Sequence, residues 1–588
     1  MKKRIAYYSL MLALILNVNL FSFGADRLYT LDMVHHNPGE TQTRSAFLRP
    51  DYLKGKGYDA KVFFLFDAAQ FGVDWSDFDS SVFPAESEER GWVDSHSGTI
   101  NSLYTAAKQE GLGVYCMLDM LVLPKGLVEK YSSQLLNEDG KIDISRPFTQ
   151  KCVRHLMRSM FKRFPQLDGL IIRTGETYLQ DAPYHIGNHP VVAGMEDHVT
   201  LLNILREEVC ERLDKNLIYR TWDMGNLHSL PKYYLGVTEK VKPHNRLYFS
   251  IKHTITDFWR MGAGEETPDY DAMETYWIGE SGRYGVSFNP CLGLGSHKQI
   301  VEVQCQREYE GKGAHPNYIA NGVIEGFSEL RDSKGIHSLQ QLNDQSDLLR
   351  GVWTWSRGGG WGGPYINNEF WIDLNASVMA RWGNNPARTE EECFSEVVAE
   401  MGLPAEQIPA FRRLCLLSAD GVLKGQYSQY GGLYVNWTRD DSMSGDAAMQ
   451  GNIDDLLRSG KGCLYIEEKD EAVKIWDEIA DLSKQISFPD RELNEFIRVS
   501  CEYGRLKYGI LSAGWKMMLK KREAELLGKE IDKEETAKLI EEYDSLWASW
   551  KDLSAYNRSC STLYKADIDF FGHQIGLNRT AEELRKRL

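Results

Sequence analysis

The sequence predicts an α/β fold: a (β/α)8 TIM barrel followed by an all-helical C-terminal domain. Eight short apolar runs recur between residues 28 and 355, each with the Val, Ile, Leu and aromatic content of a strand buried on both faces. Amphipathic stretches separate most of these runs. Eight strand-plus-helix units over about 360 residues fit such a barrel with loop insertions. An open doubly wound sheet is the alternative, but no G-x-G-x-x-G motif follows a strand.

The first 25 residues have the pattern of an export signal. Basic residues 2–4 precede a short apolar core at 10–20, and the small residues Gly24 and Ala25 offer a cleavage site. The core is shorter than the ~20 residues that a membrane-spanning helix needs. We therefore expect a periplasmic or secreted protein whose mature form has no membrane span.

The barrel is expected over residues 26–386, and its strands follow one another in chain order. The expected strands are 28–34, 61–66, 113–118, 169–173, 217–221, 247–251, 300–304 and 351–355. Helices are expected between several of them because apolar residues recur at three- and four-residue steps. These helices are 99–110, 148–164 and 198–213.

From residue 387 to residue 588 the pattern is that of a helical domain. Thr389 and Glu392 form a capping box at the start of its first helix, and the stretch 471–556 is mostly helical. One helix carries an apolar stripe that predicts packing rather than ligand binding. The stripe consists of Leu539, Tyr543, Leu546, Trp550 and Leu553. The domain could pack on its own barrel or form a homodimer interface, and the sequence leaves both open.

Composition narrows the class of ligand. The 68 basic and 84 acidic side chains give a net charge of −16, which disfavours nucleic acid and anionic membranes as partners. The 15 Trp, 29 Tyr and 23 Phe include flat faces on which sugar rings can stack, although most will fill the core. Ten cysteines without a C-x-x-C pair predict no metal site, and no motif implies a cofactor. Whether one or two disulfide bonds form is left open by the sequence, because the cysteine spacing does not assign any pair.

Polar and aromatic residues follow the strands at the end where a barrel of this kind has its active site. Carboxylates, cations and indoles should therefore meet at one rim. Hydrolysis of a glycosidic bond needs one protonated and one ionised carboxyl group, which this rim can supply. The candidates are Arg173 and Glu176 after the fourth strand, Lys252, His253, Asp257 and Arg260 after the sixth, Glu308 after the seventh, and Trp355, Arg357 and Trp361 at the eighth.

Several of these segments resemble glycoside hydrolase family 67, the α-glucuronidases. The run IVEVQCQREYEGKGAHPN at 300–317 is similar to the family's seventh-strand segment, which carries a catalytic carboxylate. SIKHTITDF at 250–258 resembles its I-K-x-x-x-x-D-F motif, and DGLIIRTGE at 168–176 corresponds to the strand that bears its general acid. The passage from Gly351 through ARWGNNPARTEEE resembles the family's entry into its helical domain. The chain departs from the family in lacking an N-terminal α/β domain and in its long segment 259–298.

The resemblance implies an inverting glycosidase that removes uronic acid residues from oligosaccharides. In it Glu176 donates the proton, Asp257 and Glu308 together activate the water, and Lys252 helps to hold the uronate carboxylate. Which of Asp257 and Glu308 is the base stays open.

Each remaining candidate is expected to bind the sugar, and each also has a purely structural alternative. The cations Arg173, His253, Arg260 and Arg357 bind an anionic sugar or neutralise neighbouring carboxylates. Trp355 and Trp361 stack on a sugar or pack beneath the glycine-rich loop. A carbohydrate-binding barrel without catalysis and a uronate-specific lyase are the competing functions.

Overall fold

The computed structural model describes most of the chain after the first 25 residues. The described residues are 26–35, 45–175, 182–223, 225–255, 258, 260, 288–305, 313–331, 335–357, 368–430, 448–557 and 577–588. Within them, eight parallel strands form a closed barrel in the order β1-β10-β9-β8-β7-β5-β3-β2. The predicted (β/α)8 barrel is thus confirmed, and the open sheet is excluded because β1 pairs with both β2 and β10.

Each of the eight predicted strands is present, with small shifts at its ends. The strands are β1 (Tyr29–Val34), β2 (Ala60–Phe63), β3 (Gly113–Asp119), β5 (Gly169–Arg173), β7 (Asn216–Arg220), β8 (Leu247–Lys252), β9 (Lys298–Gln304) and β10 (Leu349–Arg357). β2 is shorter than predicted because Leu65 takes a φ of 54°, which turns the chain into the 3-10 helix η2 (Leu65–Asp67). A small antiparallel pair, β4 (Val122–Pro124) and β6 (His185–Gly187), lies outside the barrel.

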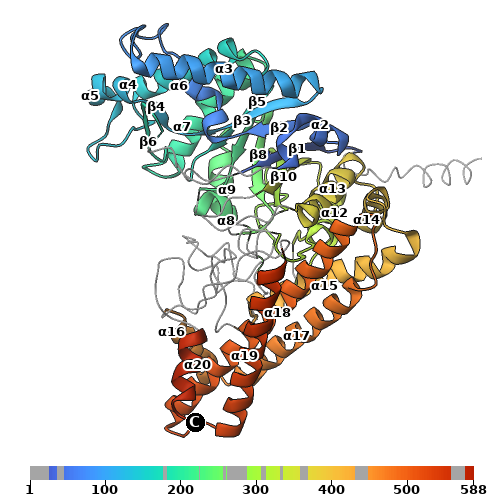
Figure 1. Cartoon of the computed structure of the whole chain (residues 1–588). Helices are drawn as coiled ribbons and strands as arrows, with labels where there is room; N and C mark the ends of the chain where they lie inside the picture. Colours follow the sequence, from blue (N-terminus) through green and yellow to red (C-terminus); the bar gives the residue numbers. More distant parts are fainter. Residues whose placement is uncertain are drawn as a thin grey trace, which may run out of the picture.

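Helices cover the outside of the barrel (Figure 1). They are α2 (Pro50–Gly55), α3 (Glu88–Gln109), α4 (Lys125–Lys130), α5 (Ser132–Leu135), α6 (Pro147–Arg163), α7 (Met195–Leu205), α8 (Asn226–Ser229), α9 (Pro231–Thr238), α11 (Ala320–Glu325), α12 (Leu339–Gln345) and α13 (Phe370–Asn384). α3 begins well before the predicted residue 99 because Ser87 caps it by accepting from the Arg90 N–H. The end of the predicted helix 198–213 is a π-helix, Arg206–Arg212.

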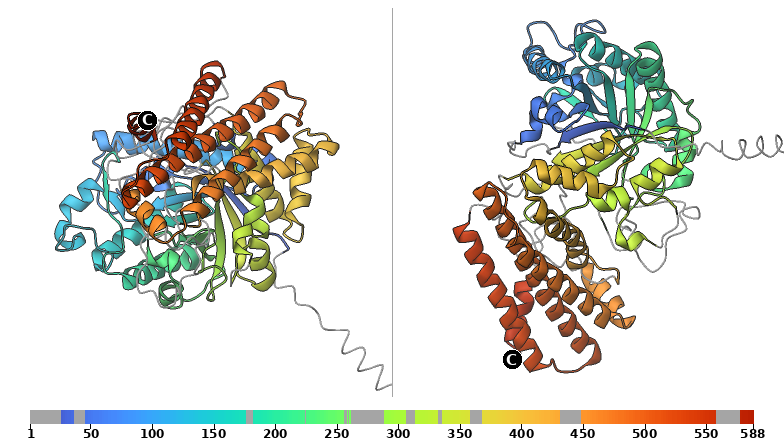
Figure 2. Two further views of the ribbon diagram at one scale, coloured as in Figure 1. Left: turned by 90° about the horizontal axis from the view of Figure 1, so that it is seen from below. Right: turned by 90° about the vertical axis from the view of Figure 1, so that its right-hand side faces the viewer.

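The C-terminal part of the chain is helical, as the sequence predicts. Its helices are α14 (Glu390–Glu400), α15 (Ile408–Gln426), α16 (Ala448–Arg458), α17 (Gly462–Ser483), α18 (Arg491–Leu527), α19 (Lys533–Tyr556) and α20 (Leu577–Arg585). The predicted capping box of Thr389 and Glu392 opens α14. Figure 2 shows the long helices running side by side away from the barrel, and α18 packs against α17, α19 and α20.

The core of the helical domain is built around large aromatic side chains. Trp476, Trp515 and Trp550 are fully buried. Gly504 of α18 lies directly against the Trp476 ring, where a Cβ would come within 2.2 Å of Cζ3. The glycine therefore lets α17 and α18 approach closely enough for the indole to fill the space between them.

The described helices include none that is long and apolar enough to cross a membrane. Nine cysteines fall within the described ranges, and all nine are free thiols, eight of them buried. Buried thiols of this kind act as small apolar side chains.

Candidate active site

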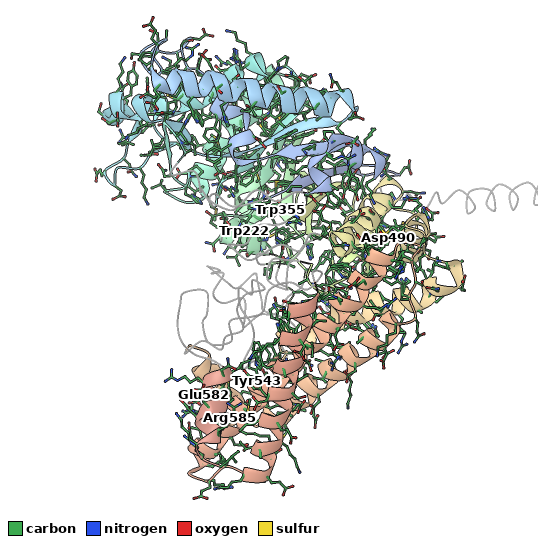
Figure 3. The ribbon with its side chains drawn as sticks, viewed as in Figure 1. Trp222, Trp355, Asp490, Tyr543, Glu582 and Arg585 are labelled. Carbon is green, nitrogen blue, oxygen red and sulfur yellow. The ribbon has the colours of Figure 1, made fainter. Side chains whose placement is uncertain are left out.

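The carboxyl ends of the barrel strands face the helical domain. Figure 3 places Trp222, just after β7, and Trp355 of β10 next to each other at this edge of the barrel. Side chains alternate along a strand, so Trp353, Trp355 and Arg357 share the inner face of β10 while Thr354 and Ser356 point outward. The inner residues at this end of the strands form the mouth of the barrel.

Two buried ion pairs fill the interior beneath the mouth. Arg173 at the end of β5 donates from Nε and Nη2 to the two Asp119 oxygens of β3, at 2.5 and 2.7 Å. Arg220 at the end of β7 does the same to Glu302 of β9, at 2.8 Å for both bonds. All four side chains are buried, and the Ser250 hydroxyl donates a further bond of 2.9 Å to Glu302. Such charges are tolerated inside a protein because each is paired and hydrogen-bonded.

Aromatic rings separate the two ion pairs. The Arg173 guanidinium lies 4.5 Å from the centre of the Phe64 ring. His35 is stacked between Phe64 and Trp355, with centroid distances of 4.6 and 5.1 Å. The Arg220 guanidinium lies 5.0 Å from the Trp355 ring on the other side. The layer is therefore continuous from β5 through β2, β1 and β10 to β7, and it forms the floor of the site.

Lys252 is enclosed by aromatic rings at the end of β8. Its Nζ lies 3.5 Å from the centre of the Trp222 ring, 4.6 Å from that of Phe258 and 5.9 Å from that of Trp355. These distances are those of cation–π contacts, which strengthen when water is excluded, and Lys252 is 1% exposed. We call Lys252 with Trp222, Phe258 and Trp355 the lysine cage.

The lysine cage offers hydrogen-bond donors. The indole N–H groups of Trp222 and Trp355 are buried and have no partner in the part of the chain that the structure describes. Burial, followed by the nearby positive charge of Lys252, lowers the pKa of His228 to about 3, so this imidazole is neutral beside the cage. Phe258 has a φ of 61°, a left-handed backbone that costs a bulky residue about 1–3 kcal/mol and that is commonest at functional sites.

The structure gives the other predicted binding residues different surroundings. His253 is fully buried, with its backbone N–H donating to the Glu302 carbonyl at 3.0 Å. Arg357 donates from Nε to Glu369 at 2.9 Å. Arg173 is paired with Asp119, the arrangement expected of a cation that neutralises a neighbouring carboxylate. Trp355 lies within the floor layer and is 6% exposed.

Arg260 lies between the barrel and the helical domain. It donates from Nε and Nη2 to Glu329 at 2.8 and 2.9 Å, and from Nη1 to the Ala419 carbonyl of α15 at 2.6 Å. Asp420 is 3.4 Å away, and the guanidinium covers the Phe327 ring at 4.2 Å. In this position Arg260 joins the segment after β8 to α15.

Glu176, Asp257, Glu308 and Trp361 lie outside the described residues, so their predicted roles stay predictions. The strands that precede the three carboxylates are β5, β8 and β9, and the barrel order places these along one arc, β9-β8-β7-β5. Their C-terminal ends surround the lysine cage, since Trp222 follows β7 and Lys252 ends β8.

Sequence reasoning missed Trp222, Arg220 and Glu302. The signal for Trp222 was present, because the tryptophan directly follows the predicted strand 217–221, as Trp355 ends the predicted strand 351–355. Arg220 and Glu302 lie within apolar runs, LIYRT and IVEVQ, where a single charge gives no indication of its partner. Only the barrel order, which brings β7 within one strand of β9, pairs them.

Outside the mouth, Asp32 of β1 is a buried carboxyl group on the outer face of the barrel wall. Burial raises its pKa to about 7, against the opposing effect of bonds from Thr354 at 2.7 Å and Ser356 at 2.8 Å. Thr354 and Ser356 point outward from the barrel and both donate to Asp32, so the Asp32 carboxyl group lies away from the mouth. We assign it no part in the site.

The fold defines the chain as a (β/α)8 barrel with a helical C-terminal domain and a polar, aromatic mouth. The sequence matches no family model and no curated protein. Among solved structures, the chain is similar to a GH138 enzyme targeting pectin rhamnogalacturonan II, with a TM-score of 0.51 and 11% identity over 92% of this chain. The match covers 63% of that enzyme, so this chain spans less than two thirds of its length.

Two other similar structures are also glycoside hydrolases by name. CpGH84B has a TM-score of 0.39 and 10% identity, covering 94% of this chain and 76% of its own. An O-GlcNAc hydrolase from Thermobaculum terrenum has a TM-score of 0.39 and 8% identity, covering 96% and 94%. At these identities the likeness concerns the fold, and it does not distinguish family 67 from other barrel hydrolases.

Proposed function

We propose that this chain is an exported glycoside hydrolase that removes uronic acid residues from oligosaccharides by an inverting, α-glucuronidase-like mechanism. The observation that carries the proposal is the lysine cage at the carboxyl end of the barrel. It presents a buried ammonium group and two indole N–H donors, a combination that suits a carboxylate. The GH138 enzyme of similar fold targets pectin rhamnogalacturonan II.

The charges around the cage support an anionic ligand. The two carboxylates of the floor, Asp119 and Glu302, are each already paired with an arginine. Lys252 is buried, and a charge-assisted bond from its ammonium group to a sugar carboxylate would be strong in this water-poor environment. A neutral sugar offers no carboxylate for this bond, which is how a buried cation can select a uronic acid.

The proposed chemistry uses the three carboxylates assigned from the sequence. Glu176 donates its proton to the leaving oxygen, while Asp257 and Glu308 activate a water molecule on the opposite side of the sugar. Inversion requires the acid and the base to stand about 6.5–9.5 Å apart, which leaves room for the water. The aromatic faces of the cage would support the sugar ring while the carboxylate is held.

Product analysis tests the reaction. A panel of uronic-acid-bearing oligosaccharides is incubated with the full chain, and the first anomer released is followed by NMR. Release of the β-anomer from an α-linkage supports inversion, and a product that absorbs in the ultraviolet would instead indicate a lyase. Tight binding without any product would favour a non-catalytic barrel.

Variants test the assigned residues. Glu176→Gln, Asp257→Asn and Glu308→Gln are each expected to abolish turnover, whereas Glu138→Gln, which changes an exposed carboxylate between α5 and α6, serves as the matched control. Full activity in all three would overturn the catalytic assignment.

Lys252→Met keeps the length of the side chain and removes its charge. We expect kcat/KM for a uronide to fall at least about a hundredfold, mostly through KM, with little change for the neutral glycoside. An equal loss on both substrates would show that Lys252 supports the fold rather than the specificity.

A further inference from the structure

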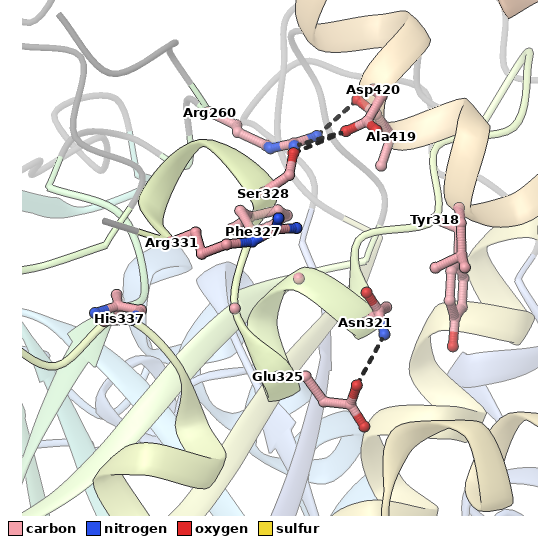
Figure 4. A pocket seen from close by; sticks show the side chains of 13 residues that line it. Arg260, Tyr318, Asn321, Glu325, Phe327, Ser328, Arg331, His337, Ala419 and Asp420 are labelled. Atoms are coloured by element: carbon pink, nitrogen blue, oxygen red, sulfur yellow. Dashed lines mark hydrogen bonds and ion pairs between the residues drawn. The ribbon is translucent and has the colours of Figure 1, made fainter. Parts of the chain in front are cut away.

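A cavity lies at the junction of the barrel and the helical domain (Figure 4). It has a volume of about 310 Å³, within the range of ligand sites, and its walls come from α11, from the 3-10 helix η7 (Ser328–Leu330) and its flanks, and from α15. The polar side chains that matter are Asn321, Glu325, Ser328, Arg331, His337 and Asp420.

The acidic groups of this cavity already have partners. Glu325 accepts from the backbone N–H of Glu390 at 2.9 Å, and Asn321 donates to its other oxygen at 3.4 Å. Asp420 accepts from Arg260 and from Ser328, both at 3.4 Å. Because Arg260 is also held by Glu329, its charge is neutralised within the protein.

Two basic groups in the cavity differ from Arg260. The exposed Arg331 side chain forms no ion pair or hydrogen bond within the described part of the chain. His337 uses Nδ1 to contact the Gly335 carbonyl at 2.9 Å, which leaves its Nε2 for a ligand. Figure 4 shows Arg331 between His337 on one side and Asn321 with Glu325 on the other. Among the residues that the structure describes, Arg331 is therefore the guanidinium of this cavity that has no ion-pair partner, whereas each carboxylate has hydrogen-bond donors.

We propose that this cavity is an accessory binding site for an acidic saccharide. The guanidinium of Arg331 takes the sugar carboxylate in a two-pronged contact, and the Asn321 side-chain oxygen, the Ser328 hydroxyl and the His337 imidazole serve ring hydroxyls. The choice of ligand rests on the proposed function, since the chain of an acidic glycan is what the active site would act on. On a protein of net charge −16, an arginine that has no ion-pair partner within the described ranges is a selective feature for such a ligand.

The position of the cavity agrees with this role. Phe327 forms its wall towards the barrel, with the Arg260 guanidinium on one side of the ring at 4.2 Å and His253 at a centroid distance of 6.5 Å. His253 directly follows Lys252 of the lysine cage. Phe327 and His253 thus link the wall of the accessory site to the strand end that carries the lysine cage, and each site can take its own glycan.

Calorimetric titration of the full-length chain carrying Glu176→Gln, with trigalacturonate as the probe, tests the proposal. Two binding events are expected. Arg331→Ala should weaken one of them at least about tenfold, Lys252→Met should weaken the other, and the double variant should lose both. Arg498→Ala, which removes an exposed arginine of α18, is the matched control and should keep both. Unchanged melting temperatures show that each variant is folded.

The outcomes separate the two proposals. Two events that persist in Arg331→Ala overturn the accessory site and leave the proposed function standing. Loss of one event in Arg331→Ala with no effect of Lys252→Met supports the accessory site and counts against uronate recognition by the lysine cage. Binding of malonate as tight as that of trigalacturonate, or of maltotriose as tight as either, would refute an acidic-saccharide site.

Discussion

The buried pair of Arg220 and Glu302 allows a quantitative test of the floor of the site. Glu302→Gln keeps the shape of the side chain and the bond from Ser250 but removes the negative charge. Arg220, 1% exposed, would then keep its charge in the barrel interior without an anion. Breaking a buried pair in this way costs about 3–5 kcal/mol of unfolding free energy, more than the hydrogen bonds alone would suggest.

Urea unfolding followed by tryptophan fluorescence measures this cost. The Trp353 and Trp355 rings lie 5.6 and 5.0 Å from the Arg220 guanidinium and are among the 15 tryptophans whose emission follows unfolding of the chain. The matched control is Asp77→Asn, which breaks the surface pair with Lys162, where both side chains are more than half exposed. That control should leave the unfolding midpoint unchanged because solvent screens the pair.

A double variant, Arg220→Met with Glu302→Leu, sharpens the test. Removing both charges also removes both desolvation penalties, so the double variant should be more stable than Glu302→Gln alone. The reasoning is refuted if Glu302→Gln unfolds at the wild-type midpoint, or if the double variant loses as much stability as the two single changes added together.

Two further changes test the barrel wall and the helical domain. Because burial raises the pKa of Asp32 to about 7, the folded chain holds this proton more tightly than the unfolded chain, and stability should fall as the pH rises from about 4 to about 7, by up to about 4 kcal/mol. Asp32→Asn should remove that fall in urea titrations at pH 4.5 and 7.5, and an unchanged pH profile would contradict the assignment. Gly504→Ala places a Cβ against Trp476 and should destabilise the helical domain by about 1–3 kcal/mol in thermal unfolding. A rise in melting temperature would show that the indole has room to move.

Most of the fold could be predicted from local patterns. Runs such as KVFFLF and GLIIR are apolar on both faces, which is enough to indicate buried parallel strands, and Thr389 with Glu392 marks the start of α14 through a capping box. The Leu65 turn was not predictable in this way, since a positive φ at a leucine has no signature in the sequence.

The candidate site was predicted only in part. The position of Lys252 at a strand end follows from the sequence, but the three rings around it come from β7, β10 and the segment after β8. For Arg260 the prediction and the structure differ. Its place in the sequence, shortly after the same strand, predicts a residue of the mouth, but its side chain donates to Glu329 and to the Ala419 carbonyl of α15.

The sequence by itself determined the number and order of the strands, the change to helices near residue 386 and the end of the barrel at which polar residues gather. These depend on side-chain period and on residues close in the chain. The tertiary structure alone decided what surrounds each charge: Arg173 pairs with Asp119, Arg220 pairs with Glu302, and Lys252 lies among aromatic rings. The reason is that a charge is stabilised by whatever lies within a few ångströms of it, and barrel closure brings together groups as far apart as residues 220 and 302.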